Sequence, residues 1–172
     1  MERPILAQTP TALNQTIRKA RSAFQAGRYA EAEGLWRKVV DQQPNSAEAF
    51  YELGFSLHLQ EEIGAAIASY QKALSLDPNY DTPYINLGLA FIELMQYDKA
   101  DQAFQKVLSF PDQPETPAST HALAHYNLAI IHKRQDNLES ARQHAQSALT
   151  LAPEFQAAQA LLQQIDNPEP EE

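Results

Sequence analysis

Cysteine is absent from the 172-residue chain, and only five glycines occur. Without cysteine the chain can form no disulfide, no thiolate nucleophile and no cysteine-containing zinc site. The glycines are too scattered to form a phosphate-binding loop, and the chain contains neither a nucleophile elbow nor a His-Glu-x-x-His zinc motif. We therefore expect no enzyme activity and no cofactor, and stability must come from packing alone.

Basic residues and long apolar runs are also scarce. Lys and Arg number 13 against 22 Asp and Glu, which gives a formal net charge of -9. This balance disfavours nucleic acid and anionic membranes, because both attract clustered cations. No segment approaches the roughly 18 apolar residues of a spanning helix, and Ile5-Leu6-Ala7 is too short for a signal-peptide core. We expect a soluble protein, cytoplasmic by default; a removed upstream segment would leave a periplasmic, lumenal or membrane-tethered location open.

The chain repeats itself with a period of 34 residues and one insertion. Several columns of similar residues recur at separations of 34, 34 and 41 residues, and the last interval is 34 plus seven. The columns are Ala20, Gly54, Gly88 and Ala129; Ala32, Ala66, Ala100 and Ala141; Tyr29, Ile63, Tyr97 and Leu138; and the bulky Trp36, Tyr70 and Phe104, with Ala145 fourth. Because several independent columns share the same insertion, chance does not explain the repeat.

Each repeat is expected to be a pair of helices. Apolar residues within a unit lie mostly three or four positions apart, which is the spacing of one helix face. Pro44, Pro78 and Pro153 lie where each second helix must stop, and Gly27 suits the end of the first helix. Gly54 lies where paired helices cross, so a large side chain there would force their backbones apart.

These features resemble the tetratricopeptide repeat family over roughly Leu13 to Phe155. The best match is Phe50-Tyr51-Glu52-Leu53-Gly54, followed by Ala66, Tyr70 and Asp77-Pro78. The resemblance implies an all-α fold, a right-handed α-solenoid of four helical hairpins with a C-terminal capping helix. The expected repeats span residues 13–46, 47–80, 81–114 and 122–155, within an array at 11–155 that follows an N-terminal extension at 1–10.

The insertion and the C-terminal residues lie outside the regular repeats. The proline-rich insertion at 111–120, Pro111 to Thr120, contains the seven extra residues, and we expect an exposed loop. It is either a tolerated insertion or a partner-contacting loop. Residues 156–166 place apolar side chains on one helical stripe and should cap the last hairpin. Residues 167–172 form an acidic, proline-bearing tail that we expect to be disordered.

Three of the five histidines fall on one face of a predicted helix. His121, His125 and His132 lie within about 40° on a helical wheel, and the first two have metal-ligand spacing. His132 lies about 10 Å further along the axis, too far to share an ion with them. His125 and His132 occupy columns that are aromatic or aliphatic in other repeats. Core packing is therefore the favoured interpretation, with no metal site, and protonation would make this hairpin sensitive to mild acid.

The concave face of such an array would carry the first-helix side chains that the core does not use. Apolar and aromatic residues dominate this face, and an exposed apolar groove usually marks a binding surface. The alternatives are that neighbouring helices partly cover these residues or that the groove closes on a second copy. The candidate groove residues are Arg21, Tyr51, Phe55, Ile85, Asn86, Leu89, Tyr126, Asn127, Ile130 and Arg134.

Asn86 and Asn127 occupy equivalent places in successive repeats. The family resemblance implies that this column can hold the main chain of a ligand, and a primary amide both donates and accepts hydrogen bonds. Some family members clamp a chaperone's terminal carboxylate with Lys and Arg around such an asparagine. Here the corresponding flanks include Tyr51, Phe55 and Leu123 rather than cations, which disfavours that ligand.

The sequence as a whole predicts a non-catalytic adaptor or scaffold that binds a protein or peptide segment in its groove, in the assembly of a multiprotein complex. A self-assembling structural protein that buries the same surface in a homo-oligomer is the alternative. An RNA-binding helical repeat is a third, and the 34-residue period and acidic middle argue against it. We expect no nucleic-acid partner and no membrane insertion.

Overall fold

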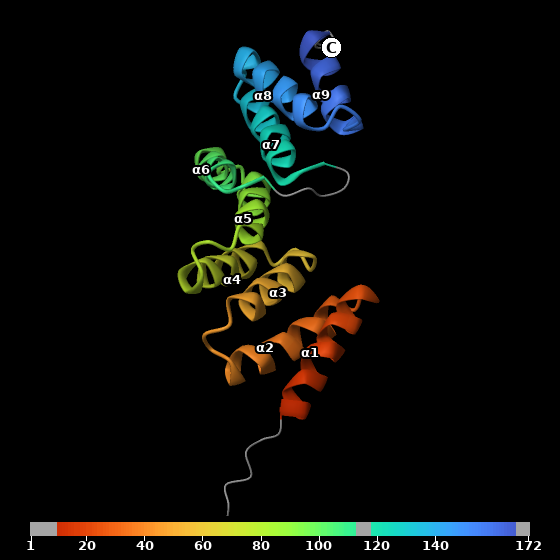
Figure 1. Cartoon of the computed structure of the whole chain (residues 1–172), viewed down its shortest axis with the longest axis vertical. Coiled ribbons are helices and arrows are strands. Elements are labelled where there is room, and N and C mark those ends of the chain that lie inside the picture. The colour runs from red at the N-terminus through yellow and green to blue at the C-terminus, as the bar shows by residue number, and fades with distance from the viewer. Residues whose placement is uncertain (1–9, 113–117, 168–172) are drawn as a thin grey trace, which may run out of the picture. The chain divides into compact units, whose positions relative to one another are not determined.

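The computed structural model describes residues 10–112 and 118–167, which form helices joined by turns and contain no strand (Figure 1). The helices are α1 (Pro10–Gln25), α2 (Tyr29–Gln42), α3 (Ala47–His58), α4 (Ile63–Leu76), α5 (Thr82–Glu93), α6 (Tyr97–Leu108), α7 (Thr120–Arg134), α8 (Leu138–Leu151) and α9 (Gln156–Asp166). This architecture confirms the predicted all-α helical repeat. The predicted extension at 1–10 and tail at 167–172 lie outside the described residues, apart from Pro10, which starts α1, and Asn167.

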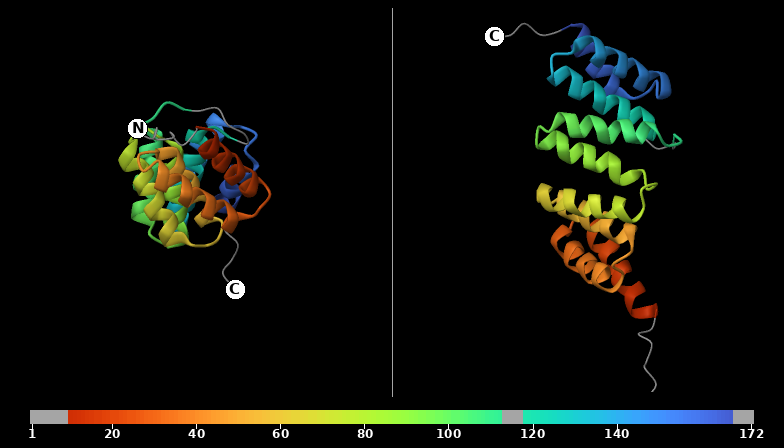
Figure 2. Two further views of the ribbon diagram at one scale, coloured as in Figure 1. Left: turned by 90° about the horizontal axis from the view of Figure 1, so that it is seen from below. Right: turned by 90° about the vertical axis from the view of Figure 1, so that its left-hand side faces the viewer.

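The chain divides into two compact units, one ending at Pro83 and the other beginning at Tyr84. In the first unit α1 packs on α2 and α3 on α4, and α2 also packs on α3. In the second unit α7 packs on α8, α6 on α7, and α8 on α9. Figure 2 shows the paired helices of each unit running side by side. Within a unit, the second helix of one hairpin therefore packs against the first helix of the next.

Each described hairpin turns through one residue with a left-handed backbone. These residues are Gly27, Glu61, Met95 and Asp136, with φ of 72°, 64°, 55° and 59°. The residue after each of these closes the turn with a backbone hydrogen bond. In the first turn the Arg28 N–H donates to Ala23 O at 2.9 Å, and the equivalent amide makes the equivalent bond in the other three turns. The predicted role of Gly27 is confirmed. The other three turns place side chains where the left-handed conformation costs about 1–2 kcal/mol, a cost that the closing hydrogen bonds must offset.

The packing of each middle hairpin depends on a glycine under an aromatic ring. A Cβ atom on Gly54 would lie 2.8 Å from the Tyr70 ring, and one on Gly88 would lie 2.6 Å from the Phe104 ring. Tyr70 and Phe104 are completely buried. The ring from the second helix therefore rests directly on the backbone of the first, which explains why both columns recur with the same period.

The last hairpin lacks this aromatic ring, and α9 occupies the space. Ala129, Ala141 and Ala145 form a buried cluster with Leu161 and Ile165 of α9. Arg142 on α8 also donates to an Asp166 carboxylate oxygen at 2.7 Å. Small residues on α7 and α8 thus create room for the apolar stripe of α9, which covers the end of the second unit.

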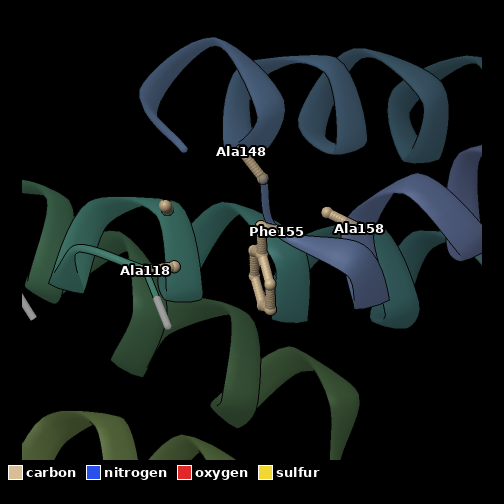
Figure 3. Packing of buried hydrophobic residues seen from close by; sticks show 5 residues of the cluster. Ala118, Ala148, Phe155 and Ala158 are labelled. Atoms are coloured by element: carbon tan, nitrogen blue, oxygen red, sulfur yellow. The ribbon is translucent and has the colours of Figure 1, made fainter. Parts of the chain in front are cut away.

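The end of the 111–120 insertion differs from the predicted exposed loop. Ala118 is only 2% exposed and packs in a cluster with Ala148 and Phe155 (Figure 3). Ser119 caps α7 by accepting from the Ala122 amide at 3.3 Å, and Thr120 is the first helical residue. The exposed-loop prediction is wrong for Ala118 to Thr120, because Ala118 joins the buried cluster around Phe155 and Ser119 and Thr120 begin α7. Pro111 and Asp112 are exposed, and residues 113–117 lie outside the described residues.

The close approach at the two glycines predicts a sharp difference among Gly→Ala variants. Gly54→Ala and Gly88→Ala should each lower the free energy of unfolding by about 1–3 kcal/mol, because a methyl group overlaps a buried ring. Gly34→Ala is the matched control, since it lies inside α2 with nothing within 4 Å of its added Cβ. That change should leave stability unchanged or raise it by up to about 1 kcal/mol. Urea unfolding followed by circular dichroism measures all three, and equal stabilities would contradict this packing.

Candidate functional site

In the first unit, the candidate surface is a cluster of aromatic rings on α3 and its neighbours. Tyr51 and Phe55 are both partly exposed. Phe55 packs on Phe24 of α1 with ring centroids 4.9 Å apart. Tyr51 lies 6.0 Å from Phe55 and 5.4 Å from Tyr80, which follows α4. Neighbouring rings therefore cover part of each candidate residue, and the rest of its side chain is exposed.

Charged residues also lie beside this cluster. Arg21 of α1 forms an ion pair with Glu48 of α3. Burial raises the pKa of Glu52, an effect that Arg21 opposes and Glu48 reinforces. Burial, followed by the nearby Tyr51 and carboxylates, also raises the pKa of the Tyr80 hydroxyl. Arg21, predicted as a groove residue, is thus paired with one of the protein's own carboxylates.

In the second unit, the candidate residues divide into a partly exposed apolar set and one buried amide. The apolar set is Ile85 and Leu89 on α5 and Tyr126 and Ile130 on α7; Asn86 is also partly exposed, and Arg134 is exposed at the end of α7. Asn127 is only 7% exposed, and its amide nitrogen donates to Leu123 O at 2.8 Å. The two asparagines are therefore not equivalent in their surroundings, and Asn86 is the more accessible.

The predicted histidine face contains a packed cluster that also includes His144 of α8. His125 Nδ1 and His144 Nδ1 lie 2.9 Å apart, and the His132 ring stacks on His144 at 5.3 Å. His132 Nε2 also lies 3.8 Å from an Asp101 carboxylate oxygen of α6. His144 was not predicted from the sequence, because it lies on the second helix of its hairpin and belongs to no repeating column.

His121 is not part of this packed cluster and instead bonds to residues at the start of the insertion. Its ring nitrogen Nε2 lies 2.8 Å from Phe110 O, and its amide donates to an Asp112 oxygen at 2.9 Å. Burial tends to raise the pKa of Asp112, but bonds from the His121 amide and the Ser119 and Thr120 hydroxyls outweigh it and lower that pKa. His121 therefore holds together the two ends of the insertion.

Neither a metal site nor a membrane span emerges from the part of the chain that the structure describes. No three His, Cys, Asp or Glu side chains there are grouped to hold a metal ion. None of the described helices has the length and apolarity needed to cross a bilayer. The distinctive features of this surface are its aromatic and aliphatic side chains.

Three sequence models of the tetratricopeptide repeat match the chain, at residues 17–81, 69–102 and 122–155. The chain belongs to the tetratricopeptide repeat family. Comparison with curated proteins gives no match.

Solved structures of helical-repeat proteins share the fold at low sequence identity. MamA from Desulfovibrio magneticus RS-1 is 21% identical over 90% of this chain and 83% of its own, with a TM-score of 0.78. PilF of Pseudomonas aeruginosa is 20% identical over 90% and 68%, with a TM-score of 0.76. YrrB, described as having an unusual peptide-binding site, is 22% identical over 87% and 73%, with a TM-score of 0.74.

The histidine cluster predicts a loss of stability in mild acid. One Nδ1 of the His125 and His144 pair must donate and the other accept, so protonating both breaks their bond. Burial and the charge of His121 lower the pKa of His125, while burial, His125 and His132 lower that of His144 to about 4. The unfolded chain, with histidine pKa near 6.5, therefore binds protons that the folded chain does not. Stability should be complete above about pH 6.5 and fall as the pH drops toward 4.

Allowing for solvent screening at this half-buried site, we expect a loss on the order of 1–2 kcal/mol. Thermal melting followed by circular dichroism at pH 7.5, 6, 5 and 4.5 measures it. His144→Gln cannot titrate, so its melting temperature should depend less on pH than that of the wild type. Parallel pH profiles for the two proteins would contradict the assignment to this cluster.

Proposed function

We propose that the chain is a non-catalytic adaptor that holds an extended segment of another protein against the first helices of its hairpins, in the assembly of a multiprotein complex. The observation that carries this proposal is a recurring set of partly exposed apolar side chains. The set consists of Tyr51, Phe55, Ile85, Leu89, Tyr126 and Ile130. These side chains lie on α3, α5 and α7, the first helices of their hairpins.

The physical chemistry of these side chains suits a polypeptide ligand. Large aromatic side chains supply contact area at a small entropic cost, and the ring contacts of Tyr51 and Phe55 fix their orientation before binding. Asn86 adds an amide that can pair with a peptide main chain of any sequence. Apolar pockets for side chains and an amide for the main chain are the two parts of extended-segment recognition.

The comparisons are in keeping with this proposal without identifying the partner. Helical-repeat arrays commonly bind other proteins along their first-helix surfaces. YrrB, which shares the fold, is described as having a peptide-binding site. The most closely spaced histidines, His125 and His144, are explained by packing between α7 and α8.

A displayed library of random peptides tests the proposal. Peptides selected on the wild type should bind Tyr51→Ala/Phe55→Ala at least about ten-fold more weakly, because truncated aromatic anchors commonly cost more than 1 kcal/mol each. Asn86→Ala should weaken binding about two-fold to ten-fold. Asn127→Ala is a weaker test, because Asn127 is only 7% exposed.

The matched control is Lys38→Ala/Gln71→Ala, which alters exposed residues on the second helices α2 and α4. It should bind the selected peptides as the wild type does, and circular dichroism should show every variant folded. Peptides that bind the Tyr51→Ala/Phe55→Ala variant normally and the control weakly would contradict the proposal. A dimer by analytical ultracentrifugation that the aromatic variant dissociates would favour the homo-oligomer instead.

A further inference from the structure

The second unit contains a pocket between α7 and α9. It has a volume of about 440 Å³ and is lined by Tyr126, Ile130, Lys133, Arg134, Leu161 and Gln164. Four of these residues lie on α7 and two on α9. The pocket therefore exists only because the capping helix packs beside the first helix of the last hairpin.

The floor of the pocket is apolar. Leu161 is only 7% exposed and belongs to the buried cluster formed by α7, α8 and α9. Tyr126 and Ile130 pack against that cluster and are themselves partly exposed. The Tyr126 ring is also held by Phe155, with ring centroids 5.0 Å apart. A floor of this kind suits a single aliphatic or aromatic side chain.

The rim of the pocket carries two cations whose partners are neutral. Lys133 Nζ donates to Gln164 Oε1 at 2.8 Å, and Arg134 Nη1 donates to the Tyr97 hydroxyl at 3.5 Å. Within residues 10–112 and 118–167, neither cation contacts a carboxylate. Arg142 in the same unit differs, because it pairs with both Asp166 and Glu139. Two uncompensated positive charges thus flank an apolar floor on a chain of net charge -9.

The position of Lys133 and Arg134 in the last turn of α7 gives them a structural role as well. Cations there interact favourably with the free carbonyl groups at the helix end. That role explains the charge, but it does not explain why Lys133 reaches across to α9 or why both cations border an apolar pocket. A ligand that combines an apolar group with an anion would satisfy both features.

We propose that this pocket receives an apolar side chain of the bound protein segment, while Lys133 and Arg134 bind a nearby carboxylate of the same segment. This inference rests on the proposed function and adds the chemistry of the partner. Ile130 and Arg134 are one helical turn apart, about 6 Å along the axis. An extended chain advances about 3.3–3.6 Å per residue. The Asp or Glu should therefore lie one or two residues from the apolar side chain.

Selection of the displayed peptide library on two proteins tests the inference. Peptides retained by the wild type should be enriched in Asp or Glu one or two places from Leu, Ile, Met or Phe. Lys133→Gln/Arg134→Gln should not give this enrichment. Lys99→Gln/Lys106→Gln is the matched control, because it removes the same charge from two exposed residues of α6. The control should enrich the same peptides as the wild type.

Binding of synthetic peptides then gives the magnitude. A retained acidic peptide should bind the wild type about ten-fold more tightly than its Asp→Asn or Glu→Gln counterpart, since a hydrogen bond to a charged group is worth about 1.5–3 kcal/mol. The difference should disappear in Lys133→Gln/Arg134→Gln and persist in the control. The side-chain amide signals of Gln164 in NMR spectra should shift on adding the acidic peptide and much less with the amide peptide.

The possible outcomes separate this inference from the proposed function. If selected peptides need Tyr51 and Phe55 but show no acidic preference, the adaptor proposal stands and the pocket inference fails. If no peptide binds, both fail. A shift of the Gln164 signals by inorganic phosphate alone, equal to that by the peptide, would indicate a general anion site and overturn the inference. A dimer that the Lys133→Gln/Arg134→Gln variant dissociates would assign the pocket to a second copy of the chain.

Discussion

The close contact between an aromatic ring on a second helix and a glycine on the first determines how each middle hairpin packs. The Tyr70 ring leaves no room for a Cβ on Gly54, and the Phe104 ring leaves none on Gly88. A ring that rests on backbone brings the paired helices together along a fixed line. That line decides which first-helix residues enter the core and which, such as Phe55 and Leu89, remain partly exposed. The candidate binding surface is therefore a consequence of this contact.

Where the ring is missing, another element must supply the volume. Ala145 replaces the aromatic residue in the last hairpin, and Leu161 and Ile165 of α9 fill the space that it leaves. The same docking places Gln164 beside Lys133 and forms one wall of the pocket. The docking of α9 therefore both caps the array and forms the pocket.

The period of small and bulky residues was sufficient to predict the helices, their pairing and the capping helix, because those features depend on residue size at fixed spacing. The burial of Ala118 could not be predicted, since the insertion breaks the period just before it and Phe155 reaches it from about 37 positions later. The left-handed backbone at Glu61, Met95 and Asp136 could be predicted only from the register of these residues with Gly27. His144 and the buried Asn127 depend on side-chain contacts between helices, which periodicity does not report.

Photo-crosslinking from defined positions tests most directly whether the first-helix face is the binding surface. A benzophenone side chain at Phe55 or Ile130 would lie on that face, whereas one at Ala68 or Gln105 would lie on the exposed side of α4 or α6. With a peptide selected on the wild-type protein, illumination should give crosslinked product from the Phe55 and Ile130 positions and little from the other two. Equal or greater product from Ala68 and Gln105 would contradict the account and place the partner on the second helices.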